Sequence, residues 1–220
     1  VLVRPNTDLK PERSHNVNLG PRLELKKTPV GAFTVDINGF LRETKDLIVF
    51  LASVQGAPHQ NILDVSSRGV EGAASWDAPG RYVGLDVSCT YQDIRNATTS
   101  GVFAATNGRR MPNRPWLLGS AGARGRVANL ALSGDALEPY FVSRYVHGFD
   151  RGWALGNPEF KLEMPAQLSH SAGVTYSLTG SSGQISGTFE VDNIGNEALF
   201  DVWGVQRPGR SFGFKLSGQL

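Results

Sequence analysis

The sequence predicts an all-β protein, an antiparallel up-and-down transmembrane β-barrel, on two observations. Apolar residues alternate with small or polar residues in about nine segments of the 220-residue chain, which is the pattern of two-faced strands. The connections between these segments are alternately short and long. Such alternation is expected when strands run up and down through a membrane, between short periplasmic turns and longer extracellular loops.

The alternating segments follow one another through the whole chain. The clearest places Leu168, Val174 and Leu178 on one face and Ser169, Thr175 and Ser177 on the other. The expected strands cover residues 15–27, 33–50, 69–77, 83–92, 116–126, 138–146, 168–178, 185–192 and 211–220. In each of them the second face is small and polar rather than apolar, as the inside of a wide, wet barrel requires.

The connections separate the two ends of the predicted barrel. Short turns are expected at 28–31, 77–80 and 179–184, a turn of middling length at 129–135, and long loops at 55–61, 96–114, 147–166 and 192–210. This layout gives an odd strand count, whereas single-chain bacterial barrels have even numbers. The chain also opens without an initiator Met or a signal peptide. We therefore expect a piece of a longer protein, with the missing strands N-terminal to Val1 or on another chain.

Composition excludes several classes of protein. Charged residues make up 19% of the chain and both signs are present, so no nucleic-acid surface is predicted. The single cysteine, Cys89, excludes an internal disulfide framework and a Cys-rich zinc site. The longest apolar run, residues 47–52, is far shorter than the roughly 20 residues that a transmembrane helix needs.

Chemistry typical of an enzyme is not visible in the sequence. The four histidines are scattered without metal-ligand spacing, so neither a metal nor another cofactor is expected. Glu71, Asp86 and Glu190 fall on the polar faces of their strands, where we expect lumen-lining pairs with Arg or Lys rather than catalytic carboxylates. Aromatic residues near the strand ends suit an aromatic girdle: Trp76, Tyr82, Tyr91, Trp116, Tyr140, Tyr145 and Tyr176.

Ligand contacts are expected in the long loops, because loops on a rigid scaffold carry recognition. The candidate ligand-binding residues are His59, Gln60, Arg109, Arg110, Phe149, Asp150, Arg151, Trp153 and Trp203. Aromatic and arginine side chains together could grip a catecholate or a sugar. The alternative is that they pack loop on loop or meet lipopolysaccharide phosphates.

Four stretches carry a family resemblance. Residues 6–14, Asn-Thr-Asp-Leu-Lys-Pro-Glu-Arg-Ser, followed by Leu19-Gly20, are similar to the Asn-Pro-x-Leu-Lys-Pro-Glu-x-Ser signature in the barrel of TonB-dependent outer-membrane receptors. Residues 68–71, 111–115 and 192–210 resemble three further landmarks of that family, in the same order. Asn18 stands where the family usually has Glu, and Leu220 where its terminal residue is usually Phe.

The resemblance implies a barrel of about 22 strands in the bacterial outer membrane, at the large end of the barrel range. Residues 1–220 would be its C-terminal portion, and the earlier strands, the plug domain and the segment that contacts TonB would lie outside them. It also implies a transporter of a scarce nutrient, such as a ferric siderophore, whose partners are TonB, outer-membrane lipid and a small-molecule ligand. Two alternatives stay open: a non-transporting barrel or adhesin, and a soluble β-sandwich binding module.

Overall fold

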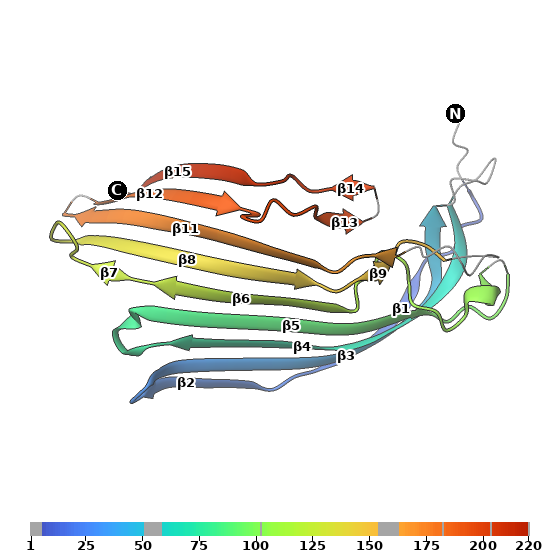
Figure 1. Cartoon of the computed structure of the whole chain (residues 1–220). Helices are drawn as coiled ribbons and strands as arrows, with labels where there is room; N and C mark the ends of the chain where they lie inside the picture. Colours follow the sequence, from blue (N-terminus) through green and yellow to red (C-terminus); the bar gives the residue numbers. More distant parts are fainter. Residues whose placement is uncertain are drawn as a thin grey trace.

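The computed structural model describes residues 6–50, 59–101, 103–153, 163–181, 183–202 and 204–219. They form one large antiparallel sheet of 11 strands, in which a path of nine neighbours runs β1-β3-β4-β5-β6-β8-β11-β12-β15 (Figure 1). The strands are β1 (Arg13–Leu19), β2 (Arg22–Thr28), β3 (Gly31–Phe50), β4 (His59–Asp77), β5 (Val83–Asn96), β6 (Leu117–Gly125), β7 (Val127–Ala128), β8 (Asp135–Val146), β11 (Gln167–Gly180), β12 (Gly183–Asp192) and β15 (Ser211–Gln219). The predicted all-β, up-and-down architecture is confirmed.

The smaller elements lie in the connections. Two strand pairs form outside the large sheet, β9 (Phe149–Asp150) with β10 (Glu163–Met164) and β13 (Phe200–Val202) with β14 (Val205–Gln206). The helical turns are η1 (Pro79–Arg81) and η2 (Ala104–Thr106). Within the described part of the chain, no helix has the length and apolar character needed to cross a membrane.

The predicted alternation of connections divides the sheet into two ends. The short connections β2 to β3, β4 to β5, β7 to β8 and β11 to β12 gather at the left of Figure 1, which we call the turn end. The longer connections, with β9, β13 and β14, gather at the opposite side, which we call the loop end. Neighbouring strands on the nine-strand path therefore run in alternating directions between the same two rims.

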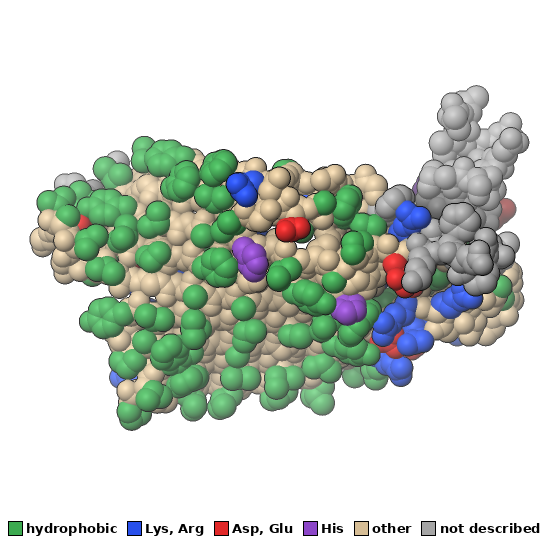
Figure 2. Space-filling view, in the orientation of Figure 1, with side chains coloured by type: hydrophobic (Ala, Val, Ile, Leu, Met, Phe, Trp, Pro, Cys, Tyr) green, Lys and Arg blue, Asp and Glu red, His purple; other side chains and the backbone are tan. Residues whose placement is uncertain are grey.

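The register sorts the side chains into an apolar face and a polar face. Val35, Ala74, Val87 and Ala121 are consecutive cross-strand neighbours on the apolar face. Large side chains on this face stay exposed, for example Val87 at 50% and Phe214 at 73%. Figure 2 shows hydrophobic side chains spread over this side of the sheet. So wide an exposed apolar surface is typical of a wall against lipid.

The opposite, polar face carries hydrogen bonds and ion pairs between strands. Arg124 on β6 contacts Asp77, and its Nη1 lies 3.6 Å from Asp86 Oδ1. Glu190 accepts a hydrogen bond of 3.0 Å from the Tyr140 hydroxyl. Asp86 thus has the arginine partner that was predicted, whereas Glu190 pairs with a tyrosine instead of an Arg or Lys.

The sandwich alternative is wrong, because a sandwich buries the inner faces of two packed sheets. Among the described residues only the short pairs β9–β10 and β13–β14 lie outside the one large sheet. No second sheet of the described residues covers the exposed apolar side chains of this face. Examples are Val17 on β1 and Phe212 on β15, the first and last strands of the nine-strand path.

The first predicted strand, residues 15–27, is divided into β1 and β2, which pair with successive parts of β3. The interruption is at Gly20-Pro21, because proline has no N–H to donate to the ladder. Gly20 also lies so close to β3 that a Cβ there would stand 2.3 Å from the Ile37 carbonyl oxygen. The apolar residues of both halves stay on one face, since Val17 pairs with Leu41 and Leu23 with Val35.

The polar loop predicted at 55–61 is wrong at its C-terminal end. His59, Gln60 and Asn61 belong to β4, where His59 pairs with Phe50 and Asn61 with Ile48. Residues 51–58 lie outside the described residues. The strand continues past the apolar band because the backbone ladder to β3 continues there, although the alternation of apolar side chains has ended.

A buried carboxylate closes one turn-end connection. Asp135, only 2% exposed, accepts hydrogen bonds from the backbone N–H groups of Leu130, Ala131 and Leu132 at 2.6–3.0 Å. Its Oδ2 also accepts one of 2.8 Å from the Tyr176 hydroxyl on β11. One side chain therefore holds the turn and ties it to the neighbouring strand.

Asp135→Ala should lower the unfolding midpoint of the receptor that carries this chain, because it leaves three backbone N–H groups and the Tyr176 hydroxyl without their charged acceptor. Urea unfolding followed by tryptophan fluorescence would measure this loss. Asp201→Ala, which removes an exposed carboxylate at the loop end, is the control and should change stability little. Equal stabilities of the two variants would contradict the role assigned to Asp135.

The two faces of β11 should respond differently to a charge. Val174 lies on the apolar face, paired with Phe189, whereas Thr175 on the polar face bonds the Thr188 hydroxyl at 2.9 Å. Val174→Arg should cost about 2–4 kcal/mol if the apolar face meets lipid, and Thr175→Arg much less. Refolding titrations of the receptor into lipid vesicles measure both. Comparable losses would reverse the assignment of the faces.

Candidate functional sites

A pocket of about 410 Å³ lies at the loop end of the polar face, and we call it the polar-face pocket. β8, β11 and β12 supply its floor and the connection between β12 and β15 covers it. Its lining residues are Tyr140, Val142, Arg144, Ser169, Ser171, Glu190, Asp192, Asn193, Leu199, Arg207, Pro208, Gly209 and Ser211. Two arginines, two carboxylates and a tyrosine hydroxyl converge there, a set suited to a polar ligand with anionic and hydroxyl groups.

The connection over this pocket is held by local hydrogen bonds. Asn193, 4% exposed and at φ 49°, accepts from the Glu197 N–H at 2.9 Å and donates to the Glu197 carbonyl at 2.8 Å. Gln167 on β11 bonds both backbone groups of Phe200. The N–H of Arg210 donates to Asn196 at 2.9 Å. The Arg210 side chain also donates from Nε to the Ile194 carbonyl at 2.9 Å, so the asparagine and arginine side chains of the last sequence landmark hold its turn.

The floor of the pocket depends on a small residue beside a large one. The Tyr140 ring on β8 lies across Gly173 of β11, where a Cβ would meet the ring at 2.5 Å. This close approach lets the hydroxyl reach Glu190 on β12. Tyr140 was predicted in an aromatic girdle, and that is wrong, because the register places its side chain on the polar face.

The aromatic girdle at the loop end of the apolar face consists of Tyr91, Trp116, Tyr145 and His147. Trp116 lies 5.9 Å from Tyr91 and 4.2 Å from His147, ring centroid to ring centroid. The Tyr145 hydroxyl is 2.7 Å from His147 Nδ1. Tyr91 and Tyr145 continue the apolar face because they follow Cys89 and Ser143 at a spacing of two residues. The Trp76 ring lies 6.4 Å from the Phe33 ring, centroid to centroid, at the turn end of the same face.

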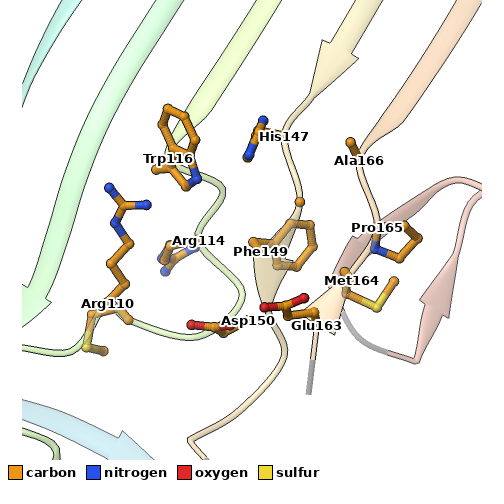
Figure 3. A pocket seen from close by; sticks show the side chains of 12 residues that line it. Arg110, Arg114, Trp116, His147, Phe149, Asp150, Glu163, Met164, Pro165 and Ala166 are labelled. Carbon is orange, nitrogen blue, oxygen red and sulfur yellow. The ribbon is translucent and has the colours of Figure 1, made fainter. Parts of the chain in front are cut away.

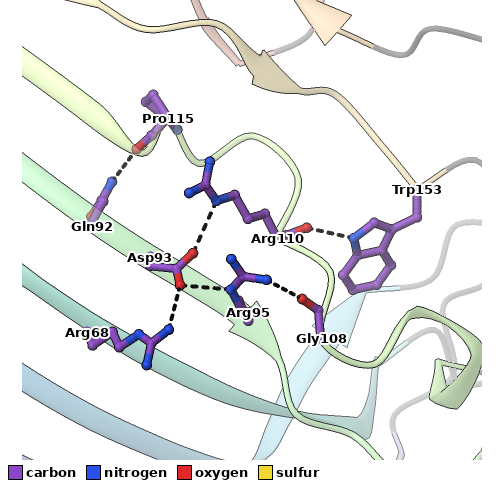
Figure 4. A network of polar contacts seen from close by, with 8 residues as sticks. All are labelled: Arg68, Gln92, Asp93, Arg95, Gly108, Arg110, Pro115 and Trp153. Atoms are coloured by element: carbon purple, nitrogen blue, oxygen red, sulfur yellow. Dashed lines mark hydrogen bonds and ion pairs between the residues drawn. The ribbon is translucent and has the colours of Figure 1, made fainter.

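Directly beyond this girdle three arginines surround one carboxylate, and we call this group the arginine cluster (Figure 4). Asp93, 3% exposed, contacts Arg68 Nη2 at 3.3 Å, Arg95 Nε at 2.8 Å and Arg110 Nε at 3.1 Å. The guanidinium of Arg110 also lies over the Trp116 ring, 5.0 Å from its centroid. Three cations against one anion leave the cluster with a net positive charge.

Backbone contacts hold the arginine cluster in place. Arg95 donates a second hydrogen bond of 2.8 Å from Nη1 to the Gly108 carbonyl, and the backbones of Arg95 and Arg110 form an isolated bridge. The Trp153 indole donates to the Arg110 carbonyl at 2.8 Å (Figure 4). The loop after β5 and the loop after β8 thus meet at Arg110.

Beside the arginine cluster lies a second pocket, of about 660 Å³, which we call the rim pocket (Figure 3). It is lined by Arg110, Met111, Arg114, Trp116, His147, Gly148, Phe149, Asp150, Glu163, Met164, Pro165 and Ala166. Asp150 and Glu163 are cross-strand partners on β9 and β10. Desolvation against the pocket wall and the Glu163 carboxylate raise the pKa of Asp150, partly offset by Arg110 and Arg109.

The predicted ligand residues have different fates. The structure brings Arg110, Phe149 and Asp150 together in the rim pocket, and Trp153 packs beside it, 5.4 Å from Phe103. His59 and Gln60 lie instead at the start of β4. Arg109 is exposed and Arg151 half-buried, and neither lines a pocket that we describe, while Trp203 lies outside the described residues.

The sequence analysis did not identify the arginines that lie on strands. These are Arg68 and Arg95 of the arginine cluster and Arg144 of the polar-face pocket. Arg68 and Arg95 occupy apolar-face positions two and four residues past the last apolar side chains, Val70 and Tyr91. The signal that could have identified Arg68 and Arg95 is a charged residue that continues the two-residue spacing of the apolar face. Arg144 had no such signal, since polar-face charges are common. The described residues hold no group of three or more His, Cys, Asp or Glu side chains suited to a metal ion.

Comparison with known families identifies the class of protein. Residues 1–201 match the model of the TonB dependent receptor-like beta-barrel family. The chain belongs to this family, whose barrels are found in the bacterial outer membrane. A comparison with curated proteins finds no match.

Solved structures agree on the fold. The chain is similar to the ferric yersiniabactin uptake receptor FyuA of Yersinia pestis, with a TM-score of 0.63, 18% identity and 93% of this chain covered. It is also similar to the ferric citrate transporter FecA (TM-score 0.70, 16% identity, 94% covered) and to the FrpB iron transporter of Neisseria meningitidis (0.70, 15%, 98%). The matches cover 28%, 31% and 33% of those chains, so this chain spans about a third of their length.

Proposed function

We propose that this chain is the C-terminal part of the wall and extracellular loops of an outer-membrane transporter that imports a scarce nutrient such as a ferric siderophore. Family membership supports this proposal, and so do the similar structures, which are named as iron-complex or iron transporters. The observation that carries it is the two-faced sheet with a polar pocket at its loop end. A wall with lipid on one side and a wet lumen on the other requires these two faces.

The polar-face pocket is the proposed nutrient contact of this part of the receptor. Arg144 and Arg207 would bind the anionic groups of the nutrient, and Tyr140 with Glu190 would bind its hydroxyl groups. The pocket opens on the face that would look into the lumen, which a nutrient must enter. The rim pocket lies beside the apolar face, so its candidate residues are less well placed for import.

Import requires parts beyond these residues. A plug domain and the segment that contacts TonB would close and open the lumen, and further strands would complete a barrel of about 22 strands. The charges of the polar face near the turn end, Asp77, Arg124, Arg126 and Glu138, would face the plug. Residues 1–220 are thus proposed as one portion of the barrel domain.

The proposed orientation predicts which residues can be labelled from outside the cell. In a Cys89→Ala background, single cysteines at Ser100 and Gln206, at the loop end, should react with an impermeant maleimide on intact cells. Cysteines at Val30 and Ser181, at the turn end, should react only after the outer membrane is opened. The reverse pattern would invert the orientation, and labelling of neither pair would contradict an outer-membrane wall.

Nutrient import itself predicts a transport defect. Deletion of the receptor gene in its own host should abolish uptake of at least one member of a panel of radiolabelled ferric siderophores, haem, cobalamin and copper. Arg144→Gln with Arg207→Gln should then raise the half-saturating concentration of that nutrient about tenfold or more, because two charge-assisted hydrogen bonds are lost. Arg81→Gln, at the turn end, is the control and should leave it unchanged.

A non-transporting barrel or adhesin gives a different outcome. The deletion would leave every uptake rate unchanged while adhesion to a surface or a partner cell decreased. That result would falsify the import proposal without changing the assignment of the fold.

A further inference from the structure

The polar-face pocket contains two charged side chains that have no partner among the described residues. Neither the Arg144 guanidinium on β8 nor the Asp192 carboxylate on β12 takes part there in an ion pair or a side-chain hydrogen bond, although both line the pocket. Glu190 and Arg207, the other two charged residues of the pocket, each have a partner side chain, at 3.0 Å and 3.9 Å. The pocket therefore presents one unpaired cation and one unpaired anion.

The sheet register keeps these two charges apart. β8, β11 and β12 lie side by side (Figure 1), with Arg144 opposite Ser169 of β11 and Asp192 one residue beyond the pair of Ala172 and Val191. Two strand spacings and a shift of two residues along the strands put the two Cα atoms about 12 Å apart. Because the charged groups do not meet each other, the space between them is open to a ligand.

Small residues form the floor between the two charges. Ser169, Ser171 and Gly173 occupy successive polar-face positions of β11, and both serines are buried. The connection before β15 lies over this floor with Pro208 and Gly209. The hollow that results, about 410 Å³, is within the size range of small-molecule sites.

We infer that the nutrient bound in this pocket is a metal chelate that carries a protonated amine beside acidic oxygens, with Asp192 binding the amine and Arg144 the oxygens. This inference rests on the proposed import function and adds the chemical class of the nutrient and the residue that selects it. At neutral pH an alkylamine is protonated and an aspartate is ionised, so the two form a charge-assisted hydrogen bond. The planar fork of an arginine matches a pair of acidic oxygens.

The charge balance of the pocket supports this class of nutrient. Two arginines and two carboxylates give the pocket a net charge of zero, whereas the binding of a strongly anionic chelate is favoured by an excess of positive charge. A chelate with several negative charges would place some of them against Asp192 and Glu190, and this repulsion selects against it. A chelate with charges of both signs meets a complementary group at each end.

The test uses two ferric complexes that differ by one charge. The first is the complex of a linear trihydroxamate that ends in a free amine, and the second is the same complex with its amine acetylated. Binding to the detergent-purified receptor that carries this chain is measured by quenching of tryptophan fluorescence. Wild-type receptor should bind the amine form about tenfold more tightly, because only this form makes the charge-assisted hydrogen bond.

Variants assign this preference to one side chain. Asp192→Asn should bind the amine form as weakly as wild type binds the acetylated form, and its affinity for the acetylated form should not change. Asp192→Glu keeps the charge and should retain part of the preference. Arg144→Gln should weaken both complexes by the same factor, because both keep their acidic oxygens.

Glu71→Gln is the matched control, because Glu71 is an exposed carboxylate on the polar face of β4, outside the polar-face pocket. It should leave both affinities unchanged. Heat-modifiability on a gel verifies that each variant is folded.

Three results would overturn the inference. Equal affinities of wild type for the two complexes would mean that Asp192 meets another part of the receptor, and this comparison needs no variant. Equal loss of the preference in Glu71→Gln would remove the role of Asp192. Failure of wild type to bind either complex would exclude an amine-bearing chelate as the nutrient.

These results leave the import proposal standing, since a receptor that fails them can still import a strongly anionic chelate such as a ferric tricatecholate. Unchanged uptake of every nutrient after deletion of the gene would instead remove the proposed function, and this inference with it.

Discussion

The structure depends on one continuous ladder of backbone hydrogen bonds across neighbouring strands. In lipid no water is present to pair a free N–H or C=O, and each unpaired group costs several kcal/mol, so a membrane wall must pair them strand to strand. The register from β3 to β15 meets this constraint with antiparallel partners throughout. It also decides which side chains face which way, because a shift of one residue would exchange the two faces.

Charged and aromatic side chains suited to ligand binding lie where the alternation of apolar residues stops but the strands continue. β3, β4 and β5 extend beyond the apolar band, and their extra residues carry Arg68, Asp93 and Arg95. Loops then return to these extensions and add Arg110 and Trp153. On the polar face the strands carry Arg144 and Glu190 under the connection before β15. The two faces of one wall thereby present two sites at the same end, separated by the sheet itself.

The sequence predicted the structure best in the strands whose side chains alternate between the apolar face and the polar face. The two-residue period of the side chains predicted the nine-strand path and the two faces of the sheet. The lengths of the connections predicted at which end of the sheet each connection lies. The predicted strand boundaries were wrong where polar residues continue a strand, as at His59 and Gln60, and where Gly20-Pro21 interrupts a strand. Hydropathy reports the solvent around a side chain, whereas the extent of a strand is decided by backbone pairing.

By itself the sequence determined the class of fold, the two faces of each strand and the resemblance to receptor barrels. Only the tertiary structure decided which charges meet. Arg68, Asp93 and Arg110 are 25 and 17 residues apart along the chain, and their contact depends on cross-strand register and on the path of a loop. The tertiary structure also decided which loop residues line the rim pocket and which line the polar-face pocket. Local patterns cannot encode this division, because it arises from strands and loops that pair across long separations.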